Sequence, residues 1–336
     1  MRVLTVTNMY PQPSAPAHGV FVKDQVRSLR NAGIETDVIV IDGRTSRANY
    51  LFGIRKLRGA LRKSPWDLIH AHYGLTGWMA RFQVRAPMVI TFHGDDINGT
   101  PGAWLGRTTS LMIAAASRVL QPLSDATIVV SEQMRRRLWF EGLRPNVHVI
   151  PCGVDTEHFR PLAREDALKR VGLDATRRYI IFPSNPEGRN KRLDIAEAAV
   201  AIVRRRYPNV ELLVVHNKPY ALMPAFFNVS DALVLTSEAE GSPMVVKEAL
   251  ACDVPVVAVR VGDVEERIGG LPGCHLCARD PEPIARALES VLQGPRPVGI
   301  RDAVKNLDSA VIAGRVVGVY ERVLARRAVR REGMRS

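Results

Sequence analysis

The hydrophobic positions of this chain fall into short apolar runs that alternate with segments of helical periodicity. A first strand is predicted at 3–7, and a helix at 19–32, where Val22, Val26 and Leu29 recur at helical spacing. Further strands are predicted at 37–41, 67–71, 88–92, 126–130 and 147–150, with helices at 50–62, 74–84, 104–119 and 132–140. Strands that alternate with helices are typical of a parallel sheet covered by helices.

The same alternation restarts after a turn-rich segment, 151–161, which carries proline at both ends. Strands are predicted at 179–182, 210–215, 232–235, 254–259 and 274–277, helices at 193–206, 243–251 and 281–292, and a last amphipathic helix at 306–327. We therefore predict an α/β fold of two doubly wound, Rossmann-like domains, 1–155 and 156–305, which face each other across a cleft. Residues 306–336 form a C-terminal helix and basic tail. Because ligands of such sheets collect at the carboxyl ends of the strands, functional residues are expected just after strands.

Length and composition agree with this division. The 336 residues are enough for two domains with a core each, and 46% hydrophobic with 24% charged residues excludes a disordered or fibrous chain. No apolar run reaches the ~18 residues of a membrane-spanning helix, and the first residues resemble a buried strand rather than a secretion signal. Four cysteines are too few for a disulfide scaffold and suit a reducing cytoplasm. Cys274 and Cys277 form one C-x-x-C without a second pair, so a short strand is preferred to a metal site.

The net charge of +13 is unevenly distributed, with a strong excess at the C-terminal end. Residues 315–336 contain seven arginines and two glutamates, which gives +5 in 22 residues. Such a segment favours anionic surfaces, namely phospholipid headgroups, phosphorylated ligands or nucleic acid. The alternative is a solvated helix end in an arginine-rich protein.

The segment 236–255 holds two acidic residues in an apolar setting. Glu240 lies in the loop before the predicted helix 243–251, with Ser242 as its expected cap and Pro243 in its first position, and Glu248 lies inside the helix. A carboxylate buried there loses hydration unless a strong partner replaces the water, and sugar or ribose hydroxyls are suitable donors. The alternative is that an internal arginine pairs with Glu248.

Glu240 and Glu248, separated by seven residues and followed by 249–258, resemble the E-x7-E element of the retaining glycosyltransferases of family 4, which have the GT-B fold. The resemblance implies an enzyme that moves a sugar from a nucleotide-sugar donor to a glycan or lipid-linked acceptor with retention of configuration. It implies that Glu240 contacts the transferred sugar and that Glu248 holds the ribose. It also implies an acceptor-side first domain, a donor-side second domain and a C-terminal helix that returns to the first domain.

Other motifs extend the resemblance along the chain. Gly19 lies at the start of a predicted helix, in a loop that resembles the family loop near the donor phosphates. The free N–H groups and the positive end of the helix dipole at a helix start favour a phosphate there. His70-Ala-His72-Tyr-Gly and Thr91-Phe-His93-Gly-Asp95-Asp96 follow strands, and His93 matches the family histidine beside the transferred sugar. The alternative for His93 is a structural histidine with satisfied hydrogen bonds.

The donor diphosphate needs cations. Lys191 matches the family lysine, whereas Asn185 stands where the family has arginine, so we expect Arg189 to substitute for it. The alternative is a solvated basic loop. The remaining donor-binding residues that the resemblance implies are Gly241, Ser242, Pro243, Met244 and Val245.

Two departures from the family pattern are informative. The segment from 215 to 223 is short, so the base pocket is reduced and no nucleobase preference can be transferred. The stretches 241–244, 246–248 and 261–265 resemble a subgroup associated with teichuronic-acid and exopolysaccharide assembly, which implies cell-surface polysaccharide biosynthesis.

A metal role for Asp95 and Asp96 is not expected. The family fold stabilises the leaving diphosphate with basic side chains and helix ends, and adjacent residues of an extended segment point in opposite directions. We therefore expect no metal and no cofactor, and a cytoplasmic enzyme whose arginine-rich C-terminus contacts the inner face of the membrane. The alternatives are a nucleotide-sugar epimerase of the same bilobal fold and a basic nucleic-acid-binding protein, although no nucleic-acid-binding signature is present.

Overall fold

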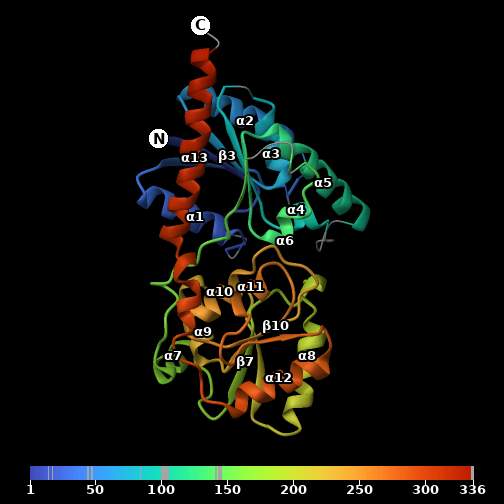
Figure 1. The fold of residues 1–336 in the computed structure, drawn as a ribbon. Coiled ribbons are helices and arrows are strands. Elements are labelled where there is room, and N and C mark those ends of the chain that lie inside the picture. Colours follow the sequence, from blue (N-terminus) through green and yellow to red (C-terminus); the bar gives the residue numbers. More distant parts are fainter. Residues whose placement is uncertain are drawn as a thin grey trace.

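The computed structural model describes residues 1–13, 15–16, 18–43, 45–46, 48–83, 85–99, 106–140, 142 and 146–333. The predicted helix ends at 84 and 104, and residues 334–336 of the basic tail, lie outside the described residues. The described chain forms two parallel sheets with helices on their faces, which confirms the predicted fold class (Figure 1).

The first sheet has six parallel strands in the order β2-β1-β3-β4-β5-β6. They are β1 (Arg2–Thr7), β2 (Glu35–Val40), β3 (Leu68–His72), β4 (Met88–Phe92), β5 (Ala126–Val129) and β6 (Val147–Val149). The helices of this half are α1 (Val20–Asn31), α2 (Asn49–Lys63), α3 (Gly74–Arg81), α4 (Asp95–Asn98), α5 (Arg107–Leu120) and α6 (Glu132–Arg135). Every residue of β3 and β4 is buried, as expected for central strands covered on both faces.

The second sheet has five parallel strands in the order β11-β10-β9-β7-β8. They are β7 (Arg178–Phe182), β8 (Val210–Val214), β9 (Ala232–Leu235), β10 (Val256–Val259) and β11 (His275–Cys277). The helices are α7 (Arg164–Val171), α8 (Leu193–Arg204), α9 (Met223–Val229), α10 (Met244–Ala251), α11 (Val264–Ile268) and α12 (Pro281–Gln293). The 3-10 helices η3 (Arg189–Lys191), η4 (Tyr220–Leu222) and η5 (Ile300–Leu307) complete this half.

Most predicted elements are present, with shifts of a few residues at their ends. The helix predicted at 132–140 is wrong in length, because α6 ends at Arg135. Four helices, α4, α7, α9 and α11, were not predicted, and α9 is short and almost wholly buried. The exact division at residues 155 and 305 stays a prediction.

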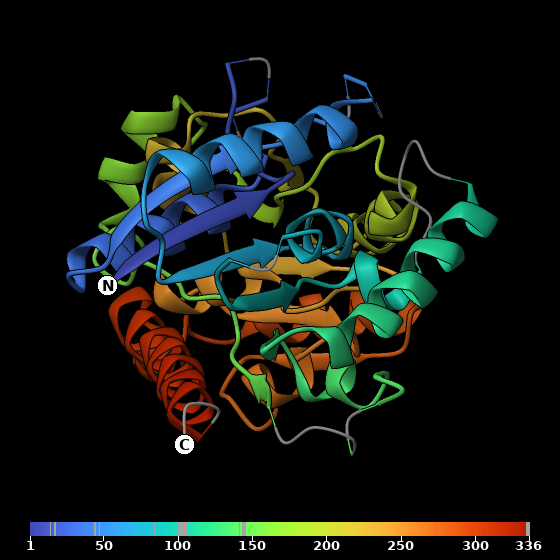
Figure 2. The same cartoon turned by 90° about the horizontal axis from the view of Figure 1, so that it is seen from above.

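The last helix, α13 (Ser309–Gly333), begins later than predicted because η5 precedes it. It also ends later than predicted. It leaves the second half and packs along the first, beside α1 (Figures 1 and 2). Its buried face carries Ile312, Val316 and Tyr320, and the Tyr320 hydroxyl lies 2.6 Å from Nδ1 of His70 in β3. The predicted return of the C-terminal helix to the first half is therefore confirmed. Within the described residues, no helix is both long enough and apolar enough to cross a membrane.

Candidate functional site

The carboxyl ends of β4 and β9 meet at the boundary between the two halves, where glycines allow backbone to touch backbone. A Cβ atom added to Gly241 would lie 2.0 Å from the carbonyl oxygen of His93, and one added to Gly262 would lie 2.6 Å from the carbonyl oxygen of Gly241. The Gly262 N–H donates to Oε1 of Gln133 at 3.0 Å. The loop after β9 is therefore clamped between the loop after β4 and a loop of its own half.

Glu240 and Lys191 form an ion pair at this boundary. The Nζ atom of Lys191 lies 2.6 Å from Oε1 of Glu240, and the two side chains are 28% and 15% exposed. The hydroxyl of Thr236, directly after β9, donates to the carbonyl oxygens of Lys191 and Arg192 at 2.8 Å each, which fixes η3 beside the strand end. The structure thus brings the two predicted residues together, with their charges neutralising each other.

Asp95 belongs to the same electrostatic group. Desolvation and the carboxylate of Glu240 raise the pKa of Asp95, and the ammonium of Lys191 opposes this effect. Asp95 and Asp96 begin the short helix α4, so the expectation of an extended segment is wrong. The Asp96 carboxylate instead accepts the backbone N–H groups of His93 and Gly94 at 3.0 Å each. In the described part of the chain, no group of three His, Cys, Asp or Glu side chains could hold a metal ion.

Glu248 is buried in α10, with 8% of its surface exposed. Its carboxyl group has no arginine partner and no hydrogen bond among the described residues, so the structure does not support the alternative of an internal ion pair with arginine. Burial raises the pKa of Glu248 to about 8, the nearby Asp24 carboxylate adds to the rise, and Lys247 opposes it. The neutral form therefore predominates at pH 7 in the unliganded protein.

Two polar residues beside Glu248 were missed by the sequence analysis. The hydroxyl of Tyr220, in η4 of the second half, donates to Oδ2 of Asp24 in α1 of the first half at 3.0 Å. Arg27 holds Asp24 at 3.2 Å and Asp155 at 2.8 Å. Burial, followed by the charge of Glu248, raises the pKa of Tyr220, so its hydroxyl stays protonated. No sequence signal marks Tyr220, because it lies in the short segment that departs from the family pattern.

The side chain of His93 is half-buried and contacts several residues of the first half. Its Nε2 lies 2.9 Å from Nδ1 of His72, its Nδ1 lies 3.9 Å from Sγ of Cys152, and the rings of Phe21 and Tyr73 pack on it. Burial lowers the pKa of His93 well below its usual value and that of His72 to about 3.

These contacts also select the tautomers. Nε2 of His72 is buried without a partner among the described residues. A bare lone pair costs less there than a bare N–H, so His72 carries its proton on Nδ1 and donates it to His93. Both ring nitrogens of His93 thus face protein atoms. The geometry is compatible with the alternative of a satisfied structural histidine, and the role of His93 beside the transferred sugar stays a prediction. At the boundary, the backbone carbonyl of His93 contacts Gly241.

Lys247 is a third residue to which the sequence analysis gave no role. It is fully buried, and its Nζ donates to the carbonyl oxygen of Cys152 at 2.8 Å and to Oγ of Ser242 at 2.5 Å. Ser242 in turn donates to Oδ2 of Asp263 at 2.8 Å. The expectation that Ser242 caps the helix is therefore wrong: its hydroxyl is occupied by Lys247 and Asp263, and α10 begins at Met244 with Pro243 as its cap. The sequence signal that could have identified Lys247 is a lysine within an otherwise apolar helix.

The other predicted residues lie around this centre. Gly19 has φ of 71°, and a Cβ atom there would lie 2.3 Å from the carbonyl carbon of Met9, so only glycine fits at the start of α1. Arg189 is exposed, and its guanidinium makes no hydrogen bond or ion pair among the described residues. Gly241, Ser242, Pro243, Met244 and Val245 lead into α10, with Met244 and Val245 half-buried.

Comparison with protein families covers both halves. Residues 16–158 match the model described as Glycosyltransferase Family 4, and residues 217–294 match the model described as Glycosyl transferases group 1.

Among other proteins, the chain is similar to TuaC of Bacillus subtilis, whose name refers to a glycosyltransferase of teichuronic acid biosynthesis, with 24% identity over 80% of this chain and 83% of TuaC. It is 24% identical to a D-inositol 3-phosphate glycosyltransferase of Thermobispora bispora, over 83% of this chain and 76% of that protein.

Solved structures share the fold across nearly the whole chain. Sucrose-phosphate synthase of Thermosynechococcus elongatus superposes with a TM-score of 0.79 at 19% identity, covering 97% of this chain and all of that one. HepE of Anabaena, in complex with UDP, superposes with a TM-score of 0.71 at 15% identity, covering 96% of this chain and 100% of its own.

Proposed function

Because this chain belongs to the family 4 glycosyltransferases of the GT-B fold, we propose that it moves a sugar from a nucleotide-sugar donor to a glycan or lipid-linked acceptor, with retention of configuration, in cell-surface polysaccharide biosynthesis. The similarity to TuaC, whose name refers to teichuronic acid biosynthesis, supports the polysaccharide pathway. The complexes of HepE with UDP and with UDP-glucose support a nucleotide-sugar donor.

The observation that carries the proposal is the Lys191–Glu240 pair at the boundary between the halves, with a separation of 2.6 Å. Lys191 is the cation for the leaving diphosphate, where negative charge accumulates in the transition state. A diphosphate carries more negative charge than one carboxylate, so donor binding draws Lys191 away from Glu240. Glu240 is then free to accept hydrogen bonds from the sugar hydroxyls, and Arg189 is close enough in sequence to assist.

Glu248 is the proposed ribose-binding residue. Its side chain is 8% exposed, and its carboxyl group has no hydrogen-bond partner among the described residues, so it is available to a ligand. A ribose diol offers both donors and acceptors, so it satisfies a neutral or an ionised carboxyl group.

The chemistry needs neither a metal nor a covalent intermediate in this proposal. Lys191, Arg189 and the start of α10 stabilise the diphosphate, and no carboxylate is proposed as a covalent nucleophile. We therefore favour departure and attack on the same face of the sugar, with a donor phosphate oxygen receiving the proton of the acceptor hydroxyl. The proposed location is the cytoplasm, with peripheral contact to the inner face of the membrane through the arginines of α13.

A thermal-shift screen of nucleotide sugars tests the donor site. A ligand at 100 times its dissociation constant should stabilise the protein by ~2.7 kcal/mol. We expect one donor to raise the melting temperature of the wild type and of the control Arg205→Ala, which removes an exposed arginine of the second half. We expect no rise in Glu248→Ala and a weaker one in Lys191→Ala.

The reaction class is tested with the donor that this screen identifies. Release of the nucleotide that depends on acceptor, with NMR showing the anomeric configuration retained in the product, is the expected result. Conversion of the donor sugar without any acceptor would indicate the epimerase instead. Absence of a thermal shift with every nucleotide sugar, in a protein that melts cooperatively, would refute the proposal.

A further inference from the structure

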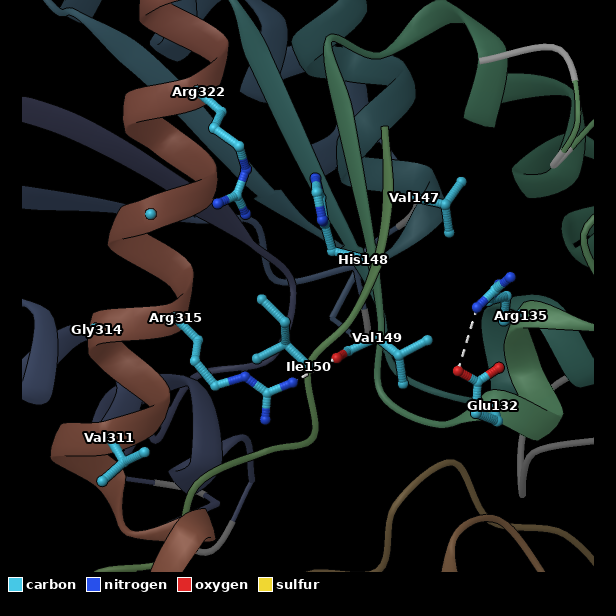
Figure 3. A pocket seen from close by; sticks show the side chains of 11 residues that line it. Glu132, Arg135, Val147, His148, Val149, Ile150, Val311, Gly314, Arg315 and Arg322 are labelled. Carbon is cyan, nitrogen blue, oxygen red and sulfur yellow. Dashed lines mark hydrogen bonds and ion pairs between the residues drawn. The ribbon is translucent and has the colours of Figure 1, made fainter. Parts of the chain in front are cut away.

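A groove of about 580 Å³ lies on the first half, between β6, α6 and α13 (Figure 3). β6 is the edge strand of the described sheet. The Ile150 N–H donates to the Val129 carbonyl of β5 at 2.9 Å. Because alternate residues of a parallel strand direct their N–H and C=O groups to opposite sides, those of Val147 and Val149 face the open edge. The volume falls within the ~300–1,000 Å³ of small-molecule sites.

The lining of the groove is basic. Three arginines line it, and the only carboxylate among its lining residues is Glu132. Glu132 lies 3.3 Å from Arg135, and Arg315 donates to the carbonyl oxygen of Val149 at 2.8 Å. Arg322 has no acidic partner and no hydrogen bond among the described residues. The positive charge of this guanidinium is therefore uncompensated, and an anion of suitable size would neutralise it.

The face of α13 that borders the groove combines charge with open space. Arg315, Arg322 and Arg326 are seven and four residues apart, so they share one side of the helix. A Cβ atom added to Gly314 would meet nothing within 4 Å, and one added to Gly318 would meet only the Arg322 guanidinium at 3.5 Å. Because neither glycine carries a side chain, the groove stays open beside the arginines.

His148 lies in the groove, where the charges of nearby arginines affect its pKa. Its side chain extends from β6 on the side of α13 and Arg322 (Figure 3). Burial lowers the pKa of His148, and the charges of Arg322 and Arg326 lower it further. An imidazole at this point is therefore a sensitive probe for a bound anion.

We propose that this groove is a second anion-binding site, separate from the donor site, which holds a phosphate or diphosphate group of the acceptor. The guanidinium groups and the strand-edge N–H groups are the donors that phosphate oxygens require. The α6 wall also contacts the second half, through Gln133 and Gly262, so the groove lies beside the boundary where transfer takes place. The assignment to the acceptor rests on the proposed glycosyltransferase function, whereas anion binding can be measured without donor or turnover.

Inorganic pyrophosphate is the first probe, and the ring resonances of His148, identified with His148→Gln, are the readout. We expect a saturable shift of these resonances in the wild type and in Lys191→Ala, which alters the donor site alone. The apparent dissociation constant should rise by at least about tenfold in Arg322→Ala and in Gly318→Leu, which places an apolar side chain in the groove at a position where a Cβ atom has room. The same change at another open helical glycine, Gly59→Leu, and the loss of a distant arginine, Arg205→Ala, should leave the constant unchanged.

A second arm separates a soluble phosphate from a lipid phosphate, with sedimentation on phosphatidylcholine vesicles containing phosphatidic acid. Weaker vesicle binding in both Arg322→Ala and Gly318→Leu, relative to Gly59→Leu, would assign the site to a lipid headgroup. Unchanged vesicle binding with weakened pyrophosphate binding would assign it to a soluble phosphate. The proposal is overturned if neither probe shifts His148, or if the two groove variants bind both probes as the wild type does. A normal thermal shift with nucleotide sugars in that case would leave the transferase function standing.

Discussion

Several ionisable side chains near the boundary between the two halves are buried, and burial shifts their pKa values away from those of exposed groups. Glu248 has its pKa raised to about 8, and His72 has its pKa lowered to about 3. Each group therefore ties the stability of the fold to pH over a defined range, since its proton affinity differs between the folded and unfolded chain.

Glu248 should destabilise the unliganded protein as the pH rises. The unfolded chain releases this proton near pH 4.5 and the folded chain near pH 8, so the stability associated with the neutral carboxyl is lost between these values. We expect Glu248→Gln to raise the melting temperature relative to the wild type, by a margin that grows from pH 5 to pH 8. Equal margins at both pH values, measured by calorimetry, would contradict the buried, unpaired state of Glu248.

His72 has the opposite pH dependence. Its neutral form contributes stability that is complete above pH 6.5 and is lost as the pH falls toward 3, because the unfolded chain takes up the proton first. We expect His72→Gln to weaken the dependence of the melting temperature on pH between 6.5 and 4. The control is His216→Gln, at an exposed histidine, which should retain the wild-type slope. A wild-type slope in His72→Gln would show that His72 is not held neutral.

At this scale the sequence predicted which residues gather but not all of their contacts. Glu240 and Lys191 were expected in one site and lie 2.6 Å apart. Tyr220 and Asp24 meet across the two halves at 3.0 Å, and no local pattern can reveal a contact between residues so distant in sequence. The contacts of His93 with His72 and Cys152 likewise join segments that are far apart in the sequence.

The loop between β9 and α10 shows how an element can serve both halves. Gly241 brings the loop against the carbonyl of His93, and Lys247 of α10 reaches the carbonyl of Cys152 in the connection between the halves. The site geometry thus depends on close backbone approach as well as on the two glutamates. The relative position of the halves is set partly by this loop.

Gly241→Ala tests that dependence. The added methyl group would lie 2.0 Å from the His93 carbonyl oxygen, so the two loops must separate, at a cost of roughly 1–3 kcal/mol. We expect a lower melting temperature and at least about a tenfold loss of kcat/KM for transfer, because small displacements at a site are costly. The control Gly59→Ala, at a helical glycine with no atom within 4 Å, should be as active as the wild type and at least as stable. Wild-type kcat/KM in Gly241→Ala would contradict this role.

Strands that are buried along their whole length were predicted well, and short helices were predicted poorly. The run 88–92 was predicted with its observed bounds, since a central strand is apolar throughout. α6 was predicted too long, because apolar residues after Arg135 continue the helical periodicity although the chain turns there. Helices α4, α7, α9 and α11 were missed, since each spans only four to eight residues and gives little periodicity to detect.

On the scale of the whole molecule, α13 joins the two halves and carries much of the basic charge. It spans 25 residues, which corresponds to about 37 Å at a rise of about 1.5 Å per residue. One side packs on α1 and β3, and the other presents arginines. The return of this helix was predicted from the family resemblance, whereas its hydrogen bond to His70 was not.

Membrane association should depend on this charge. We expect the protein to sediment with vesicles that contain phosphatidylglycerol at low salt and to be released at high salt, because exposed charges are screened beyond about 8 Å at physiological ionic strength. Replacing Arg326 and Arg330, both exposed, by alanine should weaken low-salt binding. Exposed arginines of the second half, Arg205 and Arg206, provide a control double substitution. Binding that is equal at both salt concentrations would argue against an electrostatic contact.

The hydrogen bond between Tyr320 and His70 has a consequence for the synthesis of the protein on the ribosome. Ribosomes synthesise β3 some 250 residues before the tyrosine that completes its surroundings. Until α13 emerges, the nascent first half exposes apolar surface beside α1, which is a substrate for chaperones such as those that hold unfinished chains. A polypeptide interrupted before residue 309 should therefore be aggregation-prone and degraded, even though every strand of both sheets has already been translated.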